Sequence, residues 1–339
     1  MTLTYLCTLD LPDDWFAELA RRVPDVEIVR AAAGDPPPAG VLVRVGLLHT
    51  SGWFPQAHEV PRLRCVQLDT SGVDHVRGTS LWDGGVPIAT LGGIAPVPMA
   101  EYALMSILEL AHRMPSIQRL RDARAWPSDA DRLVRLTPRE LSGATVGIVG
   151  YGRIGQEISR LANAFGMRTL GVRRNVGVAG QDATGAPRFG ATRRGPDEDP
   201  TELFPMERID DALRRSDVLV VVVPLTDLTR GLIGAERLDL LPEGALVVNI
   251  ARGGIVDEQA LRERLRDGRL GGVALDVFDD EPLPADSPWW SEPGALVTPH
   301  VAGLAPQYHA QTLDLVVENL TRVASGRPVL NEVDRVSGY

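Results

Sequence analysis

The chain contains no lysine, so its basic residues, six histidines apart, are all arginine. The absence of lysine excludes Schiff-base catalysis, attachment of pyridoxal phosphate and the P-loop lysine of nucleotide hydrolases. Cysteine is nearly as scarce, because Cys7 and Cys65 are the only two in 339 residues. Two cysteines are too few for a disulfide framework or for a zinc site built on cysteine.

Positive charge and long apolar runs are also scarce. Acidic residues outnumber basic ones 45 to 35, and the formal net charge of −10 opposes binding to nucleic acid or to an anionic membrane. No apolar run approaches the roughly 18 residues of a membrane span. Residues 1–15 carry three aspartates and no basic residue, unlike a secretory signal. We therefore expect a cytoplasmic protein with neither a nucleic acid nor a membrane as partner.

Length and hydrophobic patterning predict two α/β domains. In the first hundred residues, apolar runs alternate with a helical pattern. The second series has runs that are apolar throughout, which is typical of parallel strands covered on both faces. The first series comprises strands at Leu3–Leu9, Val41–Leu48 and Arg64–Asp69, a helix at Asp13–Arg22, a proline-rich loop at Ala31–Gly40 and a long apolar helix at Met99–His112. The second comprises strands at Ala144–Val149, Thr169–Val172, Val218–Val223, Ala245–Ile250, Gly272–Leu275 and Leu296–Thr298, with helices at Gly155–Phe165, Glu258–Asp267 and Gln307–Ala324.

One segment interrupts this alternation. Residues Asn175–Met206 are rich in glycine and proline, and a connection of that length without regular structure is uncommon inside a domain. We expect a disordered or solvated excursion there, with a functional flap as the alternative.

The strongest local motif is a glycine-rich turn that follows an apolar strand and opens a helix. Gly150 permits the tight turn, Gly152 lets the backbone approach a pyrophosphate, and Gly155 lets the helix pack closely on the strand. The helix N-terminus then offers N–H groups to the phosphates. The motif predicts a dinucleotide site.

The residues that end the next strand indicate which dinucleotide is preferred. An acidic residue about twenty positions after the motif would bind the ribose 2′-OH of NAD. The chain has Arg173 and Arg174 there, and two guanidinium groups suit the 2′-phosphate of NADP. We expect NADP(H) to be preferred, with NAD(H) possible and no metal required.

Three polar residues follow separate predicted strands in the second half. Arg252, Glu281 and His300 come after the strands that begin near residues 245, 272 and 296. Ligand sites of doubly wound sheets lie beyond the C-terminal strand ends, so these side chains should meet in one site.

Taken together, these motifs resemble the D-isomer-specific 2-hydroxyacid dehydrogenases, the family of phosphoglycerate dehydrogenase and hydroxypyruvate/glyoxylate reductase. The resemblance covers nearly the whole chain and includes the loop Pro61–Asp74, the helix start Met99–Tyr102, the strand Leu141–Gly150, the segment Pro224–Ile233 and the ending Asn331–Tyr339. It implies two doubly wound parallel-sheet domains, a Rossmann cofactor domain and a flavodoxin-like substrate domain, with a cleft between them. We expect residues 1–113 and 305–339 to form the substrate domain, and residues 114–304 the NAD(P)-binding domain.

The resemblance implies reduction of a small 2-oxo acid, or oxidation of the D-2-hydroxy acid, by a homodimer. Arg252 would bind the substrate and stabilise charge on its oxygen, while His300 would exchange a proton with that oxygen. The Glu281 carboxylate would favour the imidazolium form of His300 and fix its tautomer. Backbone N–H groups around Gly72 and Val73 would bind the substrate carboxylate. The residues assigned to the dinucleotide are Gly150, Gly152, Arg153, Ile154, Gly155, Arg173, Arg174, Pro224, Thr229, Ala251, Asp276, His300 and Gly303.

Alternatives and secondary expectations remain. Phosphite oxidation retains similar residues, and a dinucleotide-sensing corepressor could keep the fold without turnover. Formate dehydrogenase is disfavoured, because it resembles the pattern with Gln where this chain has Glu281. The other histidines should be structural, except that His49 ends a strand near the expected substrate position. Trp289 and Trp290 are expected in the core, with the pocket lining as the alternative.

Overall fold

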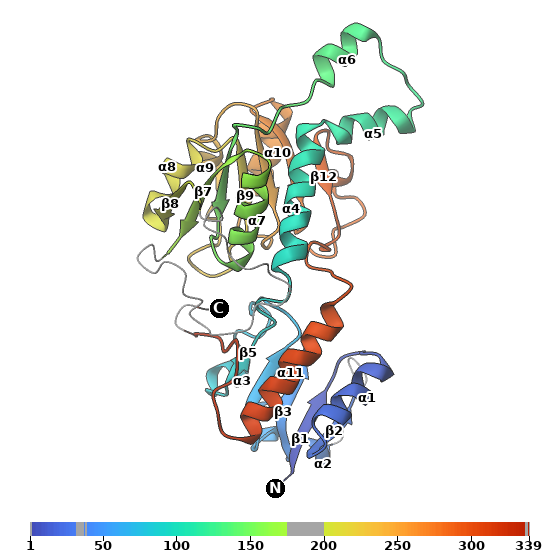
Figure 1. The fold of residues 1–339 in the computed structure, drawn as a ribbon, viewed down its shortest axis with the longest axis vertical. Coiled ribbons are helices and arrows are strands. Elements are labelled where there is room, and N and C mark those ends of the chain that lie inside the picture. Colours follow the sequence, from blue (N-terminus) through green and yellow to red (C-terminus); the bar gives the residue numbers. More distant parts are fainter. Residues whose placement is uncertain (1, 32–36, 38, 175–199, 336–337, 339) are drawn as a thin grey trace. The chain divides into compact units, whose positions relative to one another are not determined.

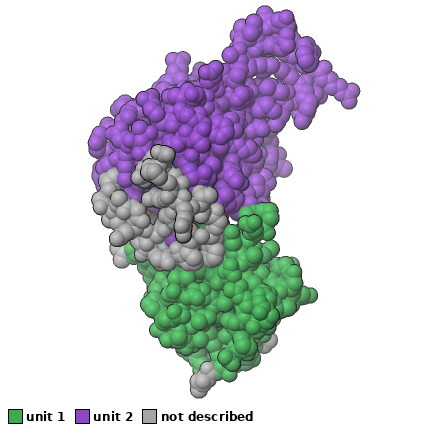
Figure 2. Space-filling model, in the orientation of Figure 1, with its two compact units in different colours: residues 1–94, 181–189, 305–339 green, residues 95–180, 190–304 purple. Residues whose placement is uncertain are grey.

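The computed structural model describes residues 2–31, 37, 39–174, 200–335 and 338, which divide into two compact units (Figures 1 and 2). Unit 1 comprises the described residues within 1–94 and 305–339, and unit 2 comprises residues 95–174 and 200–304. Each unit is built on one parallel sheet, which confirms the predicted fold class. Among the described residues, no helix is long and apolar enough to cross a membrane.

Unit 1 contains a five-stranded sheet in the order β2-β1-β3-β4-β5, which is the flavodoxin-like order. Strands β1, β3 and β4 are buried along their whole length because helices cover both faces of the sheet. Helices α1 and α11 pack on one face, and α2 and α3 on the other. The strands are β1 (Leu3–Cys7), β2 (Val26–Arg30), β3 (Val45–Thr50), β4 (Cys65–Leu68) and β5 (Ile88–Ala89), and the helices are α1 (Asp13–Arg22), α2 (Ala39–Leu42), α3 (Ser80–Asp83) and α11 (Tyr308–Ala324).

Unit 2 contains a seven-stranded sheet in the order β12-β11-β10-β9-β6-β7-β8. The chain proceeds outward from β6 to β8 and then returns to β9 and proceeds to β12, so the topological switch point lies between β6 and β9. Helices α4 and α7 cover one face, and α8, α9 and α10 cover the other. The strands are β6 (Thr145–Val149), β7 (Arg168–Arg173), β8 (Glu202–Pro205), β9 (Val218–Val221), β10 (Ala245–Asn249), β11 (Leu270–Leu275) and β12 (Ala295–Val297). The helices are α4 (Pro96–Ala111), α5 (Met114–Asp122), α6 (Asp129–Arg135), α7 (Arg153–Ala164), α8 (Ile209–Leu213), α9 (Ala235–Leu238) and α10 (Glu258–Arg266).

Helix α4 belongs to unit 2, although it was expected in the first domain. The units divide between Ile94 and Ala95, not after residue 113. The buried side chains of α4, among them Ala103 and Ile107, pack with α7 and the β6–β10 region of the unit 2 core. A helix that is apolar over most of its surface gives no sequence signal for which sheet it covers.

Two local expectations also differ from the structure. Val41 and Leu42 are helical in α2, so the strand expected over Val41–Leu48 begins only at Val45. Residues Glu202–Pro205 form β8 and pair in parallel with β7, although they lie in a segment expected to lack structure. Residues 175–199 of that segment lie outside the described residues.

The C-terminal helix is attached to the unit 1 sheet through a buried amide. Asn319 of α11 is fully buried, and its Nδ2 donates to Oε1 of Gln67 on β4 at 2.8 Å. Its Oδ1 accepts the backbone N–H of Leu330 at 2.7 Å. Asn319 therefore connects α11 to the remote strand β4 and to the segment that follows α11.

Replacing Asn319 by Ala is expected to lower the free energy of unfolding by about 2–3 kcal/mol, because Gln67 and the Leu330 N–H would lose a buried partner. Urea unfolding measures the change. Thr321→Ala is the matched control, since its exposed hydroxyl bonds only a carbonyl of the same helix and should cost less than about 0.5 kcal/mol. Equal stability of the two variants would contradict this role of Asn319.

Candidate active site

Adjacent parallel strands of unit 2 place the three predicted catalytic residues beyond one edge of the sheet. Strands β10, β11 and β12 are neighbours, and Arg252, Glu281 and His300 lie in the turns that follow their C-terminal ends. This edge also carries the turn after β6 that contains the glycine motif, because β6 runs parallel to β9 and β9 to β10. The structure therefore brings the predicted catalytic and dinucleotide residues of unit 2 to the same edge.

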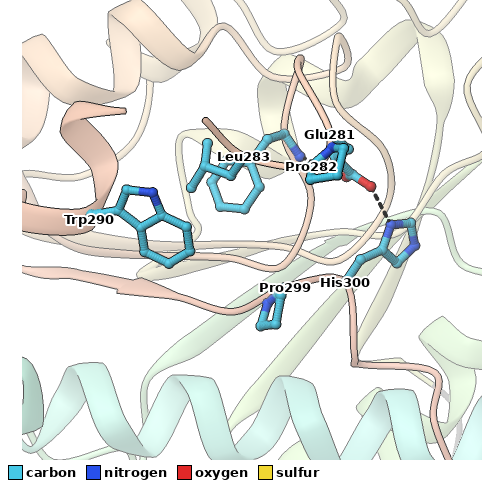
Figure 3. A pocket seen from close by; sticks show the side chains of 7 residues that line it. Glu281, Pro282, Leu283, Trp290, Pro299 and His300 are labelled. Atoms are coloured by element: carbon cyan, nitrogen blue, oxygen red, sulfur yellow. Dashed lines mark hydrogen bonds and ion pairs between the residues drawn. The ribbon is translucent and has the colours of Figure 1, made fainter. Parts of the chain in front are cut away.

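His300 and Glu281 are in direct contact (Figure 3). Nδ1 of His300 lies 2.7 Å from Oε2 of Glu281, while Oε1 of Glu281 accepts the backbone N–H of Phe278 at 3.0 Å. With Nδ1 as the donor, Nε2 is the nitrogen that can face a substrate. Both side chains remain accessible, His300 at 45% and Glu281 at 34%, so the pair can be reached by a small molecule.

A buried carboxylate fixes the loop that carries His300. Asp276 is 1% exposed, and its oxygens accept from the Thr298 hydroxyl at 2.6 Å and from the N–H groups of Val301 and Ala302 at 2.9 Å. The backbone of His300 has φ +53°, a left-handed conformation that is uncommon for a residue other than glycine. These bonds stabilise that conformation, so Asp276, which was predicted to contact the dinucleotide, holds the loop that carries His300.

Tyr102 also belongs to this arrangement, although no sequence pattern indicated a role for it. Its hydroxyl from α4 is hydrogen-bonded to the hydroxyl of Thr298. Burial raises the pKa of Tyr102, so it stays neutral near pH 7. The two residues lie 196 positions apart, and no local pattern could have indicated the contact.

The turn that carries Arg252 is held by side-chain and backbone contacts. Oδ1 of Asn249 accepts the N–H of Ala251 at 3.1 Å, and Nη1 of Arg252 donates to the carbonyl of Ala251 at 2.7 Å. A Cβ on Gly253 would lie 2.0 Å from the carbonyl oxygen of Phe278, so only glycine permits this approach of the two turns. The turn after β10 is therefore packed directly against the turn that leads to Glu281.

A cavity of about 460 Å³ adjoins the dyad (Figure 3). Glu281 and His300 form its polar part, and the rest of its lining is apolar. Trp290, expected in the core, is 51% exposed and contributes to this lining, whereas Trp289 is buried at 3% as expected. The lining residues are Phe278, Glu281, Pro282, Leu283, Trp290, Pro299 and His300.

The glycine motif has the geometry that a dinucleotide requires. Gly150 has φ +112°, and a Cβ there would lie 2.5 Å from the carbonyl oxygen of Val222. A Cβ on Gly155 would lie 2.5 Å from the carbonyl oxygen of Gly150, whereas no atom lies within 4 Å of a Cβ on Gly152. The outer glycines are thus required by packing, and the middle one borders open space at the start of α7, where a pyrophosphate fits.

The other residues predicted to contact the dinucleotide lie around the same edge. Arg173 is the last residue of β7, and Arg174 follows it. The hydroxyl of Thr229 donates to the carbonyl of Pro224 at 2.6 Å and accepts the N–H of Thr226 at 2.8 Å, so it stabilises the turn after β9. Ala251 precedes Arg252, and Gly303 lies in the turn that follows His300. Arg153 and Ile154 form the first turn of α7.

The predicted carboxylate loop lies in unit 1, after β4. Thr70 donates its hydroxyl to the carbonyl of Gly72 at 2.8 Å, and Val73 is buried at 3%. Among the residues that the structure describes, no group of three or more His, Cys, Asp or Glu side chains could hold a metal ion.

Comparisons with known proteins agree with this geometry. Residues 104–302 match the family model of the D-isomer specific 2-hydroxyacid dehydrogenase, NAD binding domain. The chain is 33% identical to (S)-sulfolactate dehydrogenase of Chromohalobacter salexigens over 79% of each protein. It is 29% identical to glyoxylate/hydroxypyruvate reductase A of Salmonella choleraesuis over 96% of each.

Solved structures show the same relationship. A D-isomer specific 2-hydroxyacid dehydrogenase from Xanthobacter autotrophicus Py2, in complex with NADPH and MES, is 30% identical with a TM-score of 0.80 over the whole of both chains. The family match covers more than half of the chain, and the two-sheet fold and the dinucleotide motif agree with it. The chain belongs to the D-isomer-specific 2-hydroxyacid dehydrogenases, NAD(P)-dependent oxidoreductases that act on CH–OH groups.

Proposed function

We propose that the chain reduces a small 2-oxo acid of the glyoxylate or hydroxypyruvate type to its D-2-hydroxy acid and prefers NADPH. The observation that carries this proposal is the 2.7 Å contact between His300 and Glu281, at the sheet edge where Arg252 also emerges. The relative from Salmonella choleraesuis is named for glyoxylate and hydroxypyruvate, which supports this substrate class.

The side chains divide the chemistry between them. Arg252 presents a planar set of donors that binds a carboxylate and stabilises negative charge developing on the carbonyl oxygen. His300 donates its Nε2 proton to that oxygen, while Glu281 accepts a hydrogen bond from Nδ1 and thereby fixes the tautomer. The dinucleotide, when bound, supplies the hydride. We further propose that the backbone N–H groups of Gly72 and Val73 bind the substrate carboxylate.

Oxidation of NADPH and NADH in the presence of glyoxylate, hydroxypyruvate, pyruvate and longer 2-oxo acids tests the proposal. Turnover of at least one 2-oxo acid with NADPH is expected. Tight NADPH binding without any turnover would instead support a dinucleotide-sensing binding protein, and turnover of phosphite alone would support a phosphite dehydrogenase.

Arg252→Ala is expected to lower kcat/KM by about 10²–10³-fold, because the carboxylate and the developing oxygen charge lose their donors. Arg252→Lys should recover little, since an ammonium group lacks the planar pair of donors. Steady-state kinetics and the melting temperature are measured together. Arg264→Ala, which removes an exposed ion pair with Asp239, is the control and should retain activity. Unchanged kcat/KM in Arg252→Ala would refute its role.

The preference for NADPH is proposed from Arg173 and Arg174, which occupy the position of the ribose-binding acid. The double replacement by Ala is expected to raise KM for NADPH about tenfold or more, because charge-assisted bonds to a phosphate are lost, and to leave KM for NADH nearly unchanged. Arg168→Ala is the matched control, since Arg168 is exposed at the opposite end of the same strand. A parallel change for both cofactors would argue against recognition of the 2′-phosphate.

We propose two partners for this chain: one small 2-oxo or 2-hydroxy acid, and a second copy of the chain. We propose that it acts in the cytoplasm and binds neither nucleic acid nor a membrane.

The arm formed by helices α5 and α6, residues 114–135, extends from unit 2, and neither helix contains a buried residue (Figure 1). Trp126, Leu133 and Val134 of this arm are 85%, 74% and 83% exposed. Several large apolar side chains at that exposure in one short segment are typical of an interface.

Light scattering coupled to size exclusion tests the dimer. Trp126→Glu combined with Leu133→Glu is expected to convert the dimer to a monomer, because charges would enter an apolar contact. Val43→Glu, an exposed apolar position in unit 1, is the control and should leave the mass unchanged. A wild-type monomer would refute the proposed dimer, and a dimer that survives the double replacement would exclude this arm as its interface.

A further inference from the structure

Unit 1 contains a buried histidine that the proposed chemistry does not use. His49, on β3, is fully buried on the sheet face that α1 and α11 cover. Its Nδ1 lies 2.7 Å from the hydroxyl of Tyr5, and its ring lies 6.2 Å from the ring of Trp15. A histidine in such surroundings needs partners for both nitrogens.

The second nitrogen faces a carboxylate. Nε2 of His49 lies 3.4 Å from Oδ1 of Asp69, and the side chain of Asp69 is 19% exposed. Within the described part of the chain, these two buried atoms have no hydrogen-bond partner. Nε2 of His49 and Oδ1 of Asp69 therefore form an ion pair with each other.

The groups around His49 favour its charged form. Burial lowers the pKa of His49, but Asp69 and the Cys7 sulfur outweigh burial and raise the pKa to about 9. Tyr5 and Cys7 face it from β1, Trp15 from α1 and Asp69 from the end of β4, while Tyr308 of α11 bonds the Asp69 carbonyl. Burial raises the pKa of Tyr5, which stays neutral.

Asp69 opens the loop proposed to bind the substrate carboxylate. Its N–H donates to the carbonyl of Thr50 at 3.0 Å, and its carbonyl accepts the Tyr308 hydroxyl at 3.0 Å. The next residue, Thr70, accepts the Leu91 N–H at 2.9 Å and bonds the Gly72 carbonyl. The loop is thus anchored at the residue that His49 contacts.

We propose that His49 is a positioning residue for substrate binding: it pairs with Asp69 at the base of the loop Thr70–Val73 and cancels the negative charge there. An unpaired carboxylate three residues before Gly72 would repel a 2-oxo acid, whose own carboxylate is negative. Pairing with His49 removes that repulsion. This inference rests on the proposed function, in which Gly72 and Val73 bind the substrate.

Three variants separate charge from packing. His49→Gln keeps a donor but removes the positive charge, and is expected to raise KM for the 2-oxo acid about tenfold, equivalent to roughly 1.4 kcal/mol, with kcat within about twofold. Asp69→Asn removes both charge and repulsion, so KM should stay within about twofold of wild type. The double variant should also have a near-normal KM. A KM that stays high in the double variant would indicate packing alone and overturn the proposal.

Proton NMR of the histidine ring tests the pair without activity. The wild-type His49 resonance is expected to titrate near pH 9, as the raised pKa implies, and in Asp69→Asn its pKa should fall below 7. Titration of wild-type His49 below pH 7 would overturn the proposal even if His49→Gln failed to fold. Failure of the wild type to reduce any 2-oxo acid would overturn the proposed function, whereas an active wild type with normal KM in His49→Gln would overturn only this inference.

The same pair gives a pH-dependent stability. Because the folded pKa of about 9 exceeds the unfolded value of about 6.5, the stabilisation is complete below pH 6.5 and is lost as the pH rises through 9. The melting temperature of the wild type should therefore fall more between pH 7 and 10 than that of the double variant. Identical pH profiles would contradict the charged pair.

Discussion

The buried carboxylate of Asp276 is the constraint on which the geometry of the catalytic edge depends. A carboxylate removed from water must be satisfied by hydrogen bonds, and here the donors are the Thr298 hydroxyl and the N–H groups of Val301 and Ala302. These donors flank His300, and their bonds stabilise its left-handed backbone. The position of the imidazole beside Glu281 thus follows from an interaction that does not touch a substrate.

The sequence predicts much of this site because its strands are parallel. Runs that are apolar throughout mark buried strands, and the polar residue after each run marks the strand end. Since parallel strands present their C-terminal ends at one edge, Arg252, Glu281 and His300 could be assigned to one site from the sequence alone. The roles of Gly150 and Gly155 could likewise be predicted, because the tight turn and the close approach of the helix to the strand require glycine there.

The remaining features depend on tertiary contacts that local patterns do not encode. Helix α4 is apolar enough to cover either sheet, and only its contacts assign it to unit 2. Trp289 and Trp290 are adjacent residues of one type, yet one is buried and the other lines the cavity beside the dyad. Glu202–Pro205 becomes a strand because β7 offers it an edge, although its surroundings in the sequence are rich in glycine and proline.

Each unit contains a carboxylate that lies against a histidine ring. An enzyme that binds an anionic substrate is impaired by carboxylates near its site unless each one is neutralised. Glu281 lies against His300, and Asp69 lies against His49, so each carboxylate faces an imidazole. In the proposed function, the guanidinium of Arg252 would supply the positive charge that attracts a carboxylate. A net charge of −10 therefore does not oppose the proposed binding of an anion, because the local arrangement of charge governs binding at a site.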